Sequence, residues 1–376
     1  MDVIVGGGVV GLSLAWRLAR EGRPVTLVDP APASGASHAA AGMLAPVSEV
    51  TYTEVPLLRL GVASLRRWPG FAAELAADAG LPGAEALDLR SEGTLDVAFG
   101  ADDLAALDEL AAYLEKLELP VQRLTGRECR RLEPMLAPSV RGGLLAAGDS
   151  WVDPRRVTAA LLAALDRRGV PLVRARVAEL LRDGGQVTGG QVTGVRLEPP
   201  GDDDGRAELR ADRVILAAGA WSAGLAEVPV RPVKGQIMRL RSPQPLLTRC
   251  VRGTVHGTPV YLVPRGDGEL VVGATQEEMG FDTRVTAGGL YELLRDAREL
   301  VPGITELEVS DVVAGLRPGT PDNLPLIGPS GTPGLALATG HHRGGVLLAP
   351  LTADILLGEE GELAAMCSPG RFRDIS

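Results

Sequence analysis

Three glycines near the start of the chain have the spacing that a dinucleotide-binding turn requires. Gly6, Gly8 and Gly11 follow a short apolar stretch and open a segment with helical apolar periodicity. In such a turn the first glycine permits a tight bend, the second lets the backbone approach a pyrophosphate, and the third lets helix and strand pack closely. The helix N-terminus then offers N–H groups to the phosphates. The spacing predicts a phosphate-binding turn, and a purely structural glycine-rich turn is the alternative.

An acidic residue stands where the partner of this turn is expected. Asp29 ends the next apolar stretch, and its carboxylate can accept both hydroxyls of an adenosine ribose. A glycine motif preceded by a strand, followed by a helix and matched by an acidic residue occurs once in the sequence. This disfavours an enzyme that binds both FAD and NADPH. Two apolar strands that end in glycine favour FAD. The strand at 213–219 is of the kind that underlies an adenine or flavin in large flavoproteins. The strand at 335–340 leads into a helix beginning at 344–345, whose N-terminus could stabilise negative charge on a reduced flavin. Ordinary buried parallel strands are the alternative for both segments.

Histidine and cysteine are placed in ways that predict no metal site. His341 and His342 are adjacent, without the i, i+4 spacing and third ligand that a metal needs, so a backbone role near a flavin is expected. Cys129, Cys250 and Cys367 are odd in number and form no C-x-x-C pair, which favours a reducing compartment. Cys367 lies in the C-terminal tail, so FAD is expected to bind without a covalent link.

Length and charge restrict the class of protein further. A chain of 376 residues exceeds the usual size of one core, so two closely joined domains are expected. The net charge of −10 disfavours nucleic acid as a partner. Lys116 and Lys234 are the two lysines of the sequence, and neither stands in a G-x-x-x-x-G-K-[ST] loop. Asp2 and the early glycines argue against a signal peptide, and no apolar run is long enough to span a bilayer, so the expected location is cytoplasmic.

The elements that must position these residues alternate between strand and helix. The first three form a βαβ unit at 2–5, 9–20 and 24–28, and residues 57–126 are expected to be largely helical, with helices at 71–79 and 101–119. Further along we expect a helix at 154–168, strands at 170–175 and 213–218, a helix at 288–300, a strand at 335–339, a turn at 340–345 and a helix at 346–357. Residues 230–273 are typical of a mainly antiparallel sheet, and the repeats at 184–194 with the turn at 201–205 predict a β-meander.

The predicted fold class is therefore α/β in an α+β two-domain arrangement. A Rossmann-like FAD-binding domain is assembled from separated segments, 1–84, 146–222 and 318–376. A substrate domain with a mainly antiparallel sheet is built from 85–145 and 223–317. The nucleotide-type units lie at the start, middle and end of the chain, which is why the first domain must be discontinuous.

Five short motifs carry a family resemblance that spans nearly the whole chain. They are Ala-Ala-Ala-Gly-Met-Leu at 39–44, Val-Pro-Arg-Gly-Asp-Gly at 263–268, Val-Gly-Ala-Thr at 272–275, Ala-Gly-Leu-Arg-Pro-Gly-Thr at 314–320 and Thr-Gly-His-His-Arg-Gly-Gly-Val at 339–346. With these motifs the chain resembles the D-amino-acid oxidase family of FAD-dependent oxidoreductases, and within it the glycine oxidases of the thiamine pathway. The resemblance implies a split FAD domain with a sheet lying over the flavin, as in p-hydroxybenzoate hydroxylase.

The resemblance also implies an activity. Oxidative deamination of glycine, with sarcosine and small D-amino acids as further substrates, would give the 2-oxo acid, ammonia and hydrogen peroxide, through hydride transfer from Cα to flavin N5. The implied partners are a small amino acid and molecular oxygen, with no nucleic acid and no membrane, in a homo-oligomer. The choice among these amines stays open.

Site residues follow from the same resemblance, position by position. Substrate contacts fall on Arg317, Arg343, Tyr261 and Gln276, of which Arg317, Tyr261 and Arg343 would be catalytic. The implied FAD contacts are Gly6, Gly8, Val9, Val10, Gly11, Asp29, Pro30, Ala36, Ser37, Ala41, Gly42, Met43, Val177, Gly219, His341, His342, Arg343, Gly344, Gly345, Val346 and Leu347. His342 departs from the pattern, since an aromatic residue is common there, and Pro259 and Gln276 occupy variable rim positions.

The chemistry of an amino acid explains why these residue types are suited to the task. A guanidinium makes two parallel hydrogen bonds to a carboxylate, and Arg317, expected in a rigid turn beside Pro318, could direct such a pair. Tyr261 could donate its hydroxyl to the same carboxylate. Hydride transfer from a neutral amine needs no strong base, and no Asp or Glu stands out as one.

Two other kinds of flavoprotein remain as alternatives. The first is a quinone-linked flavin dehydrogenase of D-amino acids. Such an enzyme should carry an apolar or basic patch that binds a membrane, and the sequence of this acidic chain gives no sign of one. The second is a flavin-binding protein without turnover or a nucleic-acid-modifying flavoprotein, and the charge balance disfavours the latter.

Overall fold

The chain opens with the predicted βαβ unit. The computed structural model describes residues 1–183, 190–198, 207–358 and 361–375. It places β1 at Asp2–Val5, α1 at Val9–Arg20 and β2 at Val25–Val28. Every residue of both strands is buried, and the strands pair in parallel with Val3 opposite Thr26. The prediction of a βαβ unit is confirmed.

Strands from distant parts of the sequence complete a six-stranded sheet around this unit. Its order is β18-β19-β12-β1-β2-β8, with β18 antiparallel to β19 and the other neighbours parallel. The added strands are β8 (Leu172–Val173), β12 (Arg213–Leu216), β18 (Leu326–Pro329) and β19 (Leu335–Thr339). Because parallel strands are covered on both faces, their residues are apolar almost throughout.

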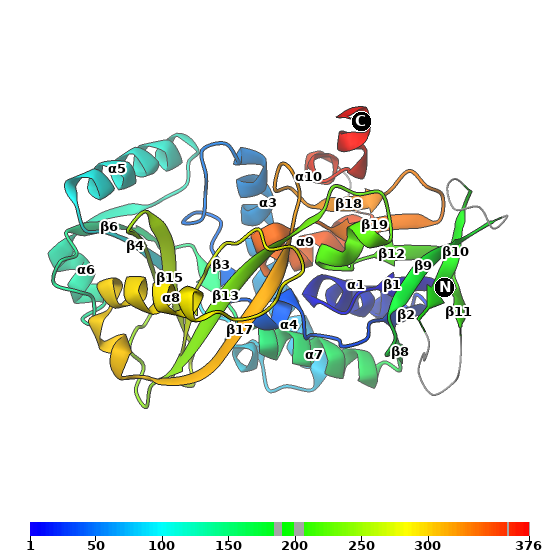
Figure 1. The fold of residues 1–376 in the computed structure, drawn as a ribbon, viewed down its shortest axis with the longest axis horizontal. Helices are drawn as coiled ribbons and strands as arrows, with labels where there is room; N and C mark the ends of the chain where they lie inside the picture. The colour runs from blue at the N-terminus through cyan, green and yellow to red at the C-terminus, as the bar shows by residue number, and fades with distance from the viewer. Residues whose placement is uncertain (184–189, 199–206, 359–360, 376) are drawn as a thin grey trace.

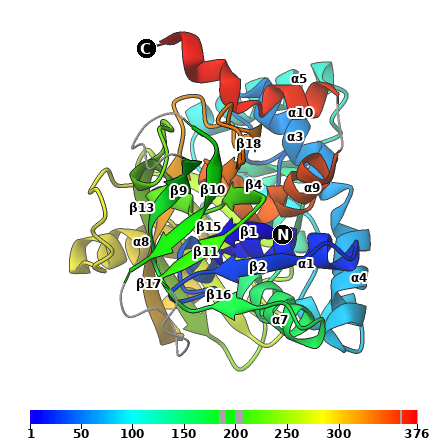
Figure 2. The ribbon, with the colours of Figure 1, turned by 90° about the vertical axis from the view of Figure 1, so that its right-hand side faces the viewer.

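Helices cover one face of this sheet and a small sheet covers the other (Figures 1 and 2). The helical layer holds Trp16, Trp68 and Phe71 in contact as aromatic pairs. It consists of α1, α3 (Val55–Leu65), α4 (Trp68–Ala79), α7 (Pro154–Arg167) and α9 (Gly345–Leu357). The opposite layer is an antiparallel sheet of β9 (Val177–Arg182), β10 (Val192–Leu197) and β11 (Glu208–Arg210).

An eight-stranded sheet forms the other half of the molecule. Its order is β17-β13-β16-β15-β14-β4-β6-β5, antiparallel except for the parallel pair β14 and β4. The strands are β4 (Thr94–Ala98), β5 (Gln122–Thr125), β6 (Gly142–Ala146), β13 (Arg231–Arg241), β14 (Cys250–Val255), β15 (Thr258–Pro264), β16 (Glu269–Gly273) and β17 (Glu308–Gly319). Helices α5 (Ala101–Lys116), α6 (Gly126–Leu132) and α8 (Ala287–Leu300) accompany it.

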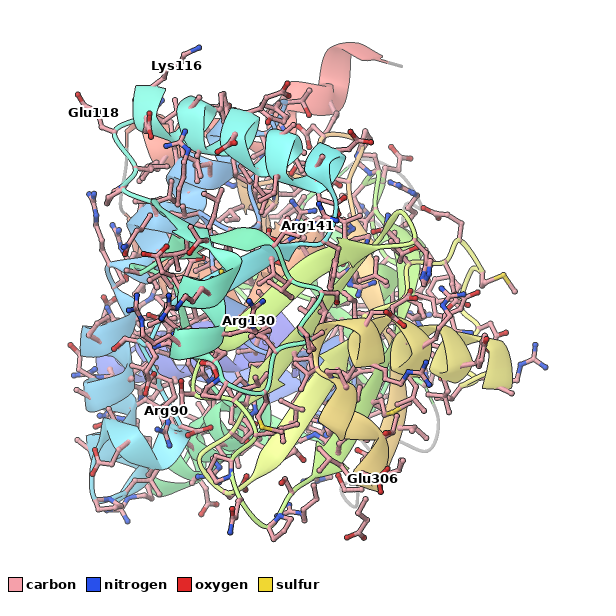
Figure 3. The ribbon with its side chains drawn as sticks, turned by 90° about the vertical axis from the view of Figure 1, so that its left-hand side faces the viewer. Arg90, Lys116, Glu118, Arg130, Arg141 and Glu306 are labelled. Atoms are coloured by element: carbon pink, nitrogen blue, oxygen red, sulfur yellow. The ribbon has the colours of Figure 1, made fainter. Side chains whose placement is uncertain are left out.

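The outer end of this half carries charges of both signs. In Figure 3, Lys116 and Glu118 point outward from the end of α5, and Glu306 points outward below α8. The remaining elements are short: α2 (Ala36–Ala39), β3 (Met43–Leu44), η1 (Ala84–Leu87), β7 (Ser150–Trp151), η3 (Gly219–Gly224), η4 (Pro302–Glu306), η5 (His342–Gly344), α10 (Glu362–Met366) and η6 (Pro369–Ile375). Among the described residues, no helix has both the length and the apolar content to cross a membrane.

The structure differs from the sequence-based expectations at two points and agrees with them at a third as far as the residues are described. Residues 57–126 hold helices as predicted but also β4 and β5, whose partners are distant in sequence. The 12-residue strand β17 was not predicted, and it includes Arg317, so the expectation of a rigid turn there was wrong. The predicted meander is present where β9, β10 and β11 are described, while its turns at 184–189 and 201–205 lie outside the described residues.

Candidate active site

A large cavity lies where the two halves of the molecule meet. Its volume is about 1380 Å³. Residues that follow the carboxyl ends of β1, β2, β12 and β19 line one part, and residues of β13, β15 and β17 line another. The carboxyl ends of parallel strands are where open α/β sheets bind ligands.

The glycine turn lines one end of the cavity. Gly6 has φ +113°, and a Cβ there would overlap the carbonyl of Ala217. A Cβ on Gly11 would overlap the carbonyl of Gly6, which leaves Gly11 outside the cavity lining and gives it the packing role. Gly8, the N-cap of α1, has no side chain that could engage the N–H groups of the first turn, and Ser37 engages that of Val9, so the N–H groups of Val10 and Gly11 remain for a ligand.

Asp29 lies beside this turn as its sequence position predicts. One carboxylate oxygen accepts the N–H of Gly7 at 2.6 Å, and the other accepts the N–H of Ala31 at 2.7 Å. Each oxygen keeps a further lone pair for a ribose hydroxyl. Ser37 accepts the N–H of Val9 at 2.9 Å, which joins α2 to the start of α1.

The segment 39–43 is held in place by a buried arginine. Arg265 is 3% exposed and donates to the carbonyls of Val152, at 3.0 Å, and Ala41. Gly42 has φ +80°, and a Cβ there would overlap the carbonyl of Val152. Burial lowers the pKa of Arg265, although it stays a cation in the neutral range. The 39–43 backbone therefore lines the cavity in one fixed conformation.

Arg317 extends from β17 over the backbone of β13. Its Nη1 donates to the carbonyl of Thr275 at 3.1 Å and lies 3.4 Å from the carbonyl of Lys234. The guanidinium lies across Gly235, where a Cβ would overlap it. A guanidinium has five N–H groups, and the two carbonyls engage at most the two on Nη1. The N–H groups on Nε and Nη2 therefore remain for a ligand in the cavity.

Tyr261 lies next to this guanidinium, on β15. Its ring packs against Gly273, where a Cβ would come within 2.5 Å of the ring. Burial raises the pKa of Tyr261 to about 12, and the neighbouring Arg317 charge opposes that rise. The hydroxyl therefore stays protonated and can donate a hydrogen bond. Arg317 and Tyr261 thus form one donor cluster on the cavity wall.

A buried polar network supports the cluster from behind. Lys234, which is fully buried, pairs with Glu277 at 3.4 Å. Glu277 also accepts from Gln236 at 2.7 Å and from the Thr275 hydroxyl at 2.6 Å, and its pKa is lowered by these hydrogen bonds against the effect of burial. Because the carbonyls of Thr275 and Lys234 accept from Arg317, this network fixes the position of its guanidinium.

The turn before α9 holds the two histidines and Arg343. His341 is 3% exposed, its Nε2 lies 2.9 Å from the Thr352 hydroxyl, and burial lowers its pKa to about 3. His342 has φ +47°, and burial lowers its pKa to about 4. Both rings are therefore neutral at pH 7. Arg343 pairs with Glu54 at 2.9 Å and donates to the carbonyl of Glu49 at 3.1 Å, so part of its guanidinium is already engaged.

The structure gathers most of the predicted site residues around one cavity. Gly11, Gly344 and Leu347 do not line it. Leu347 instead accepts hydrogen bonds from Ser64 and Trp68 through its carbonyl, and Gly344 caps α9. The other predicted contacts, including Gln276 and Val177, all line the cavity. Within the described ranges, no group of three or more His, Cys, Asp or Glu residues could hold a metal ion.

Sequence reasoning missed several polar residues on the cavity wall. Those close to Arg317 and Tyr261 or to the segments that carry them include Glu49, Arg252, Gln236 and Glu277. Arg252 and Tyr261 are cross-strand partners on β14 and β15, and Arg252 lies 3.3 Å from Asp96 of β4. No local motif marks these residues, because strand pairing and loop packing bring them together.

Comparisons with known proteins agree with this geometry. A family model described as FAD dependent oxidoreductase, DAO, matches residues 3–357. The bifunctional protein ThiO/ThiG of Nostoc sp. is 34% identical over 94% of this chain and 51% of its own length. The chain thus spans about half the length of the first curated relatives it matches. The glycine oxidase of Geobacillus kaustophilus is 34% identical over 93% of this chain and 89% of its own.

A solved structure leads to the same conclusion. The crystal structure of glycine oxidase from Geobacillus kaustophilus has a TM-score of 0.86 at 33% identity, covering 98% of each chain. The two-domain FAD-binding fold expected from the sequence is therefore present. The cavity has a glycine turn and an acidic strand end at one part, and these residues fit a flavin dinucleotide. This chain is accordingly a member of the DAO family of FAD-dependent oxidoreductases.

Proposed function

We propose that the enzyme oxidises glycine. In the overall reaction glycine, water and dioxygen give glyoxylate, ammonia and hydrogen peroxide. The observation that carries the proposal is that Arg317 and Tyr261 lie next to each other on the wall of the cavity that the glycine turn also lines. The names of the Geobacillus relative and its solved structure support glycine as the substrate, and the ThiO/ThiG relatives support a role in thiamine biosynthesis.

We assign the FAD contacts to the predicted residues that line the cavity. The pyrophosphate would lie against the first turn of α1, and Asp29 would accept the adenosine ribose hydroxyls. The isoalloxazine would lie among segment 39–43, Ile237 and the turn before α9, without a covalent link. The chemistry that FAD supplies when bound is acceptance of a hydride from the substrate and return of two electrons to dioxygen as hydrogen peroxide.

The substrate carboxylate would be held by Arg317 and Tyr261. A bidentate guanidinium pair and a phenolic O–H fix both oxygens, which leaves the Cα as the part of glycine free to face the ring. Positioning of this kind accounts for much of the rate gain in a hydride transfer that needs no strong base. Gln276 lines the cavity nearby and would limit the size of the side chain on Cα. Arg343 would contribute through the guanidinium donors that Glu54 and Glu49 leave unused.

The wider setting is part of the same proposal. We place the enzyme in the cytoplasm, as a homo-oligomer acting with molecular oxygen and without nucleic acid or membrane. The FAD-binding domain would comprise 1–84, 146–222 and 318–376, and the substrate domain 85–145 and 223–317. The six-stranded and eight-stranded sheets support this division, with the boundaries near 146 and 318 best moved to the ends of β6 and β17.

Purified protein tests the proposal directly. Anaerobic addition of glycine to the yellow protein should bleach the flavin, and air should restore the colour with release of hydrogen peroxide. A panel of glycine, sarcosine, D-alanine and D-proline, scored by peroxide, ranks the substrates. A yellow protein that is not bleached by any member would refute the proposal. One that is bleached but returns electrons only to an added quinone would establish the dehydrogenase alternative.

A further inference from the structure

Glu49 is a half-buried carboxylate on the cavity wall, in the segment between β3 and α3. Its N–H donates to the carbonyl of Ala45 at 3.1 Å, and its own carbonyl accepts from Arg343 at 3.1 Å. Within the described part of the chain, its carboxylate takes part in no hydrogen bond or ion pair. The carboxylate of Glu54, in contrast, is engaged by Arg343 and by Asn323. Glu49 is thus held by its backbone while its acid group is left available.

The neighbouring backbone is anchored so that this acid group is positioned in advance. Asp149 is fully buried and accepts the N–H groups of Val47 at 3.3 Å and Ser48 at 3.1 Å. The carbonyl of Ser48 accepts from Arg252 on β14. These bonds tie the segment that carries Glu49 to the eight-stranded sheet. A side chain on so constrained a segment can act in recognition without a large ordering cost.

Glu49 and Arg317 approach Tyr261 from different directions along the sheet. Arg317 reaches it from β17, across β13 and β16, and the segment of Glu49 is tied to β14 on the other side of β15. Both charges act on the Tyr261 hydroxyl: Glu49 raises its pKa and Arg317 lowers it. A cation and an anion are therefore both close to the phenol that is proposed to touch the substrate carboxylate.

The charges of the cavity wall leave these two groups without a charged partner. Arg252 is neutralised by Asp96 at 3.3 Å, and Arg343 is neutralised by Glu54 at 2.9 Å. Neither Arg317 nor Glu49 forms an ion pair with any described residue. A ligand that carries one negative and one positive group on the same carbon matches this arrangement. An amino-acid zwitterion is such a ligand.

We propose that Glu49 recognises the amino group of the substrate and so determines specificity for amines. The inference rests on the proposed function in that it takes a small amino acid as the substrate. The Glu49 carboxylate accepts hydrogen bonds from the ammonium group of the arriving zwitterion while Arg317 and Tyr261 hold the carboxylate. One proton then leaves the ammonium group for solvent, and Glu49 accepts a hydrogen bond from the neutral amine that transfers the hydride. A small acid that lacks the amine, such as acetate, meets the same Arg317 and Tyr261 but gains nothing from Glu49.

The experiment compares glycine with acetate in the yellow holoenzyme. The Kd of glycine is taken from the concentration dependence of anaerobic flavin bleaching, and the Ki of acetate from competition in the same assay. For Glu49→Gln, which keeps the size of the side chain, we expect the Kd of glycine to rise about tenfold or more, as for loss of a charged hydrogen bond. The Ki of acetate should stay the same or fall, because a repelling charge is gone. Glu49→Asp should restore part of the affinity for glycine.

A matched control removes an equal charge elsewhere on the cavity. Glu292 is exposed on α8 and lines the cavity there, so Glu292→Gln should leave both constants close to wild type. A rise in both constants for Glu49→Gln would mean a structural role and would overturn the inference, as would an unchanged Kd for glycine. If the wild-type protein is not bleached by glycine at all, the proposed substrate fails instead. The comparison of acetate with whichever amine does bleach it then still tests Glu49.

Discussion

The guanidinium of Arg317 lies flat across Gly235, on the neighbouring strand of the eight-stranded sheet. The register pairs Val233 with Arg317 and Gly235 with Gly315. The side chain of Arg317 therefore lies over Gly235, which is two residues along β13 from Val233, its own cross-strand partner. A Cβ at position 235 would overlap the guanidinium. The absence of a side chain at 235 is therefore what allows the arginine to reach Thr275 and Tyr261.

Gly235→Ala should consequently impair substrate binding while leaving FAD in place. The added methyl group displaces the Arg317 guanidinium, and a misplaced bidentate pair loses about one charged hydrogen bond, or roughly tenfold to a hundredfold in affinity. The Kd of glycine from anaerobic bleaching measures this loss. Gly288→Ala is the control, because that glycine also lines the cavity but faces open space. Equal effects of the two substitutions would mean that the contact with Arg317 is not what matters.

Asp29→Ala should weaken the binding of FAD and leave the binding of FMN unchanged. FMN lacks the adenosine ribose that Asp29 is proposed to hold, so it reports on the flavin end alone. Titration of the apoprotein with each flavin, followed by fluorescence quenching, gives both constants. The variant also loses the acceptors for the N–H groups of Gly7 and Ala31, which should lower the stability of the apoprotein by about 1–3 kcal/mol. Equal weakening of FAD and FMN would place the ribose contact elsewhere.

Lys234 and Glu277 should be strongly coupled in stability. Lys234 is fully buried, and removal of its partner by Glu277→Gln leaves an uncompensated cation, at a cost of about 3–5 kcal/mol. Urea unfolding of the holoenzyme measures this. The double variant Lys234→Met with Glu277→Gln should recover most of the loss, because no charge then remains buried. Additive effects of the two substitutions would show that the pair is not coupled.

The buried carboxyl of Asp149 should make the folded state less stable as pH rises through the mildly acidic range. Burial raises its pKa from 3.8 to about 6 in the folded protein, so between these values the folded state binds more protons than the unfolded state. Its favourable contribution is therefore complete below about pH 4 and is lost as pH rises through about 6. Asp149→Asn cannot titrate. The difference in unfolding free energy between the variant and wild type should shift in favour of the variant by about 2–3 kcal/mol from pH 4 to pH 7. A constant difference would contradict the assignment.

The proposed nucleotide end of the site was predictable as a structure because its parts are local in sequence. One βαβ unit contains Gly6, Gly8, the helix that follows the turn, and Asp29. Within such a unit the spacing of residues along the chain determines their relative positions in space. The turn at 340–345 was predictable in the same way, since a strand, glycines and an apolar helix follow one another directly.

The substrate end depended on contacts that spacing cannot reveal. Arg317 was identified through a family motif, but its strand and its position over Gly235 follow from pairing of β13 with β17. Glu49 was not identified at all. It reaches the cavity because Asp149 and Arg252, both distant in sequence, bind the backbone beside it. Sequence patterns carry no record of such loop anchoring.

The measurement that tests the central claim most directly is the Kd of glycine for yellow Arg317→Ala protein, obtained from anaerobic bleaching. The account predicts a rise of about a hundredfold or more, since two hydrogen bonds to a charged group are lost, with the flavin spectrum retained. Arg317→Lys should recover only a part, because an ammonium cannot form the bidentate pair. A glycine Kd near that of wild type in the yellow Arg317→Ala protein would contradict the account.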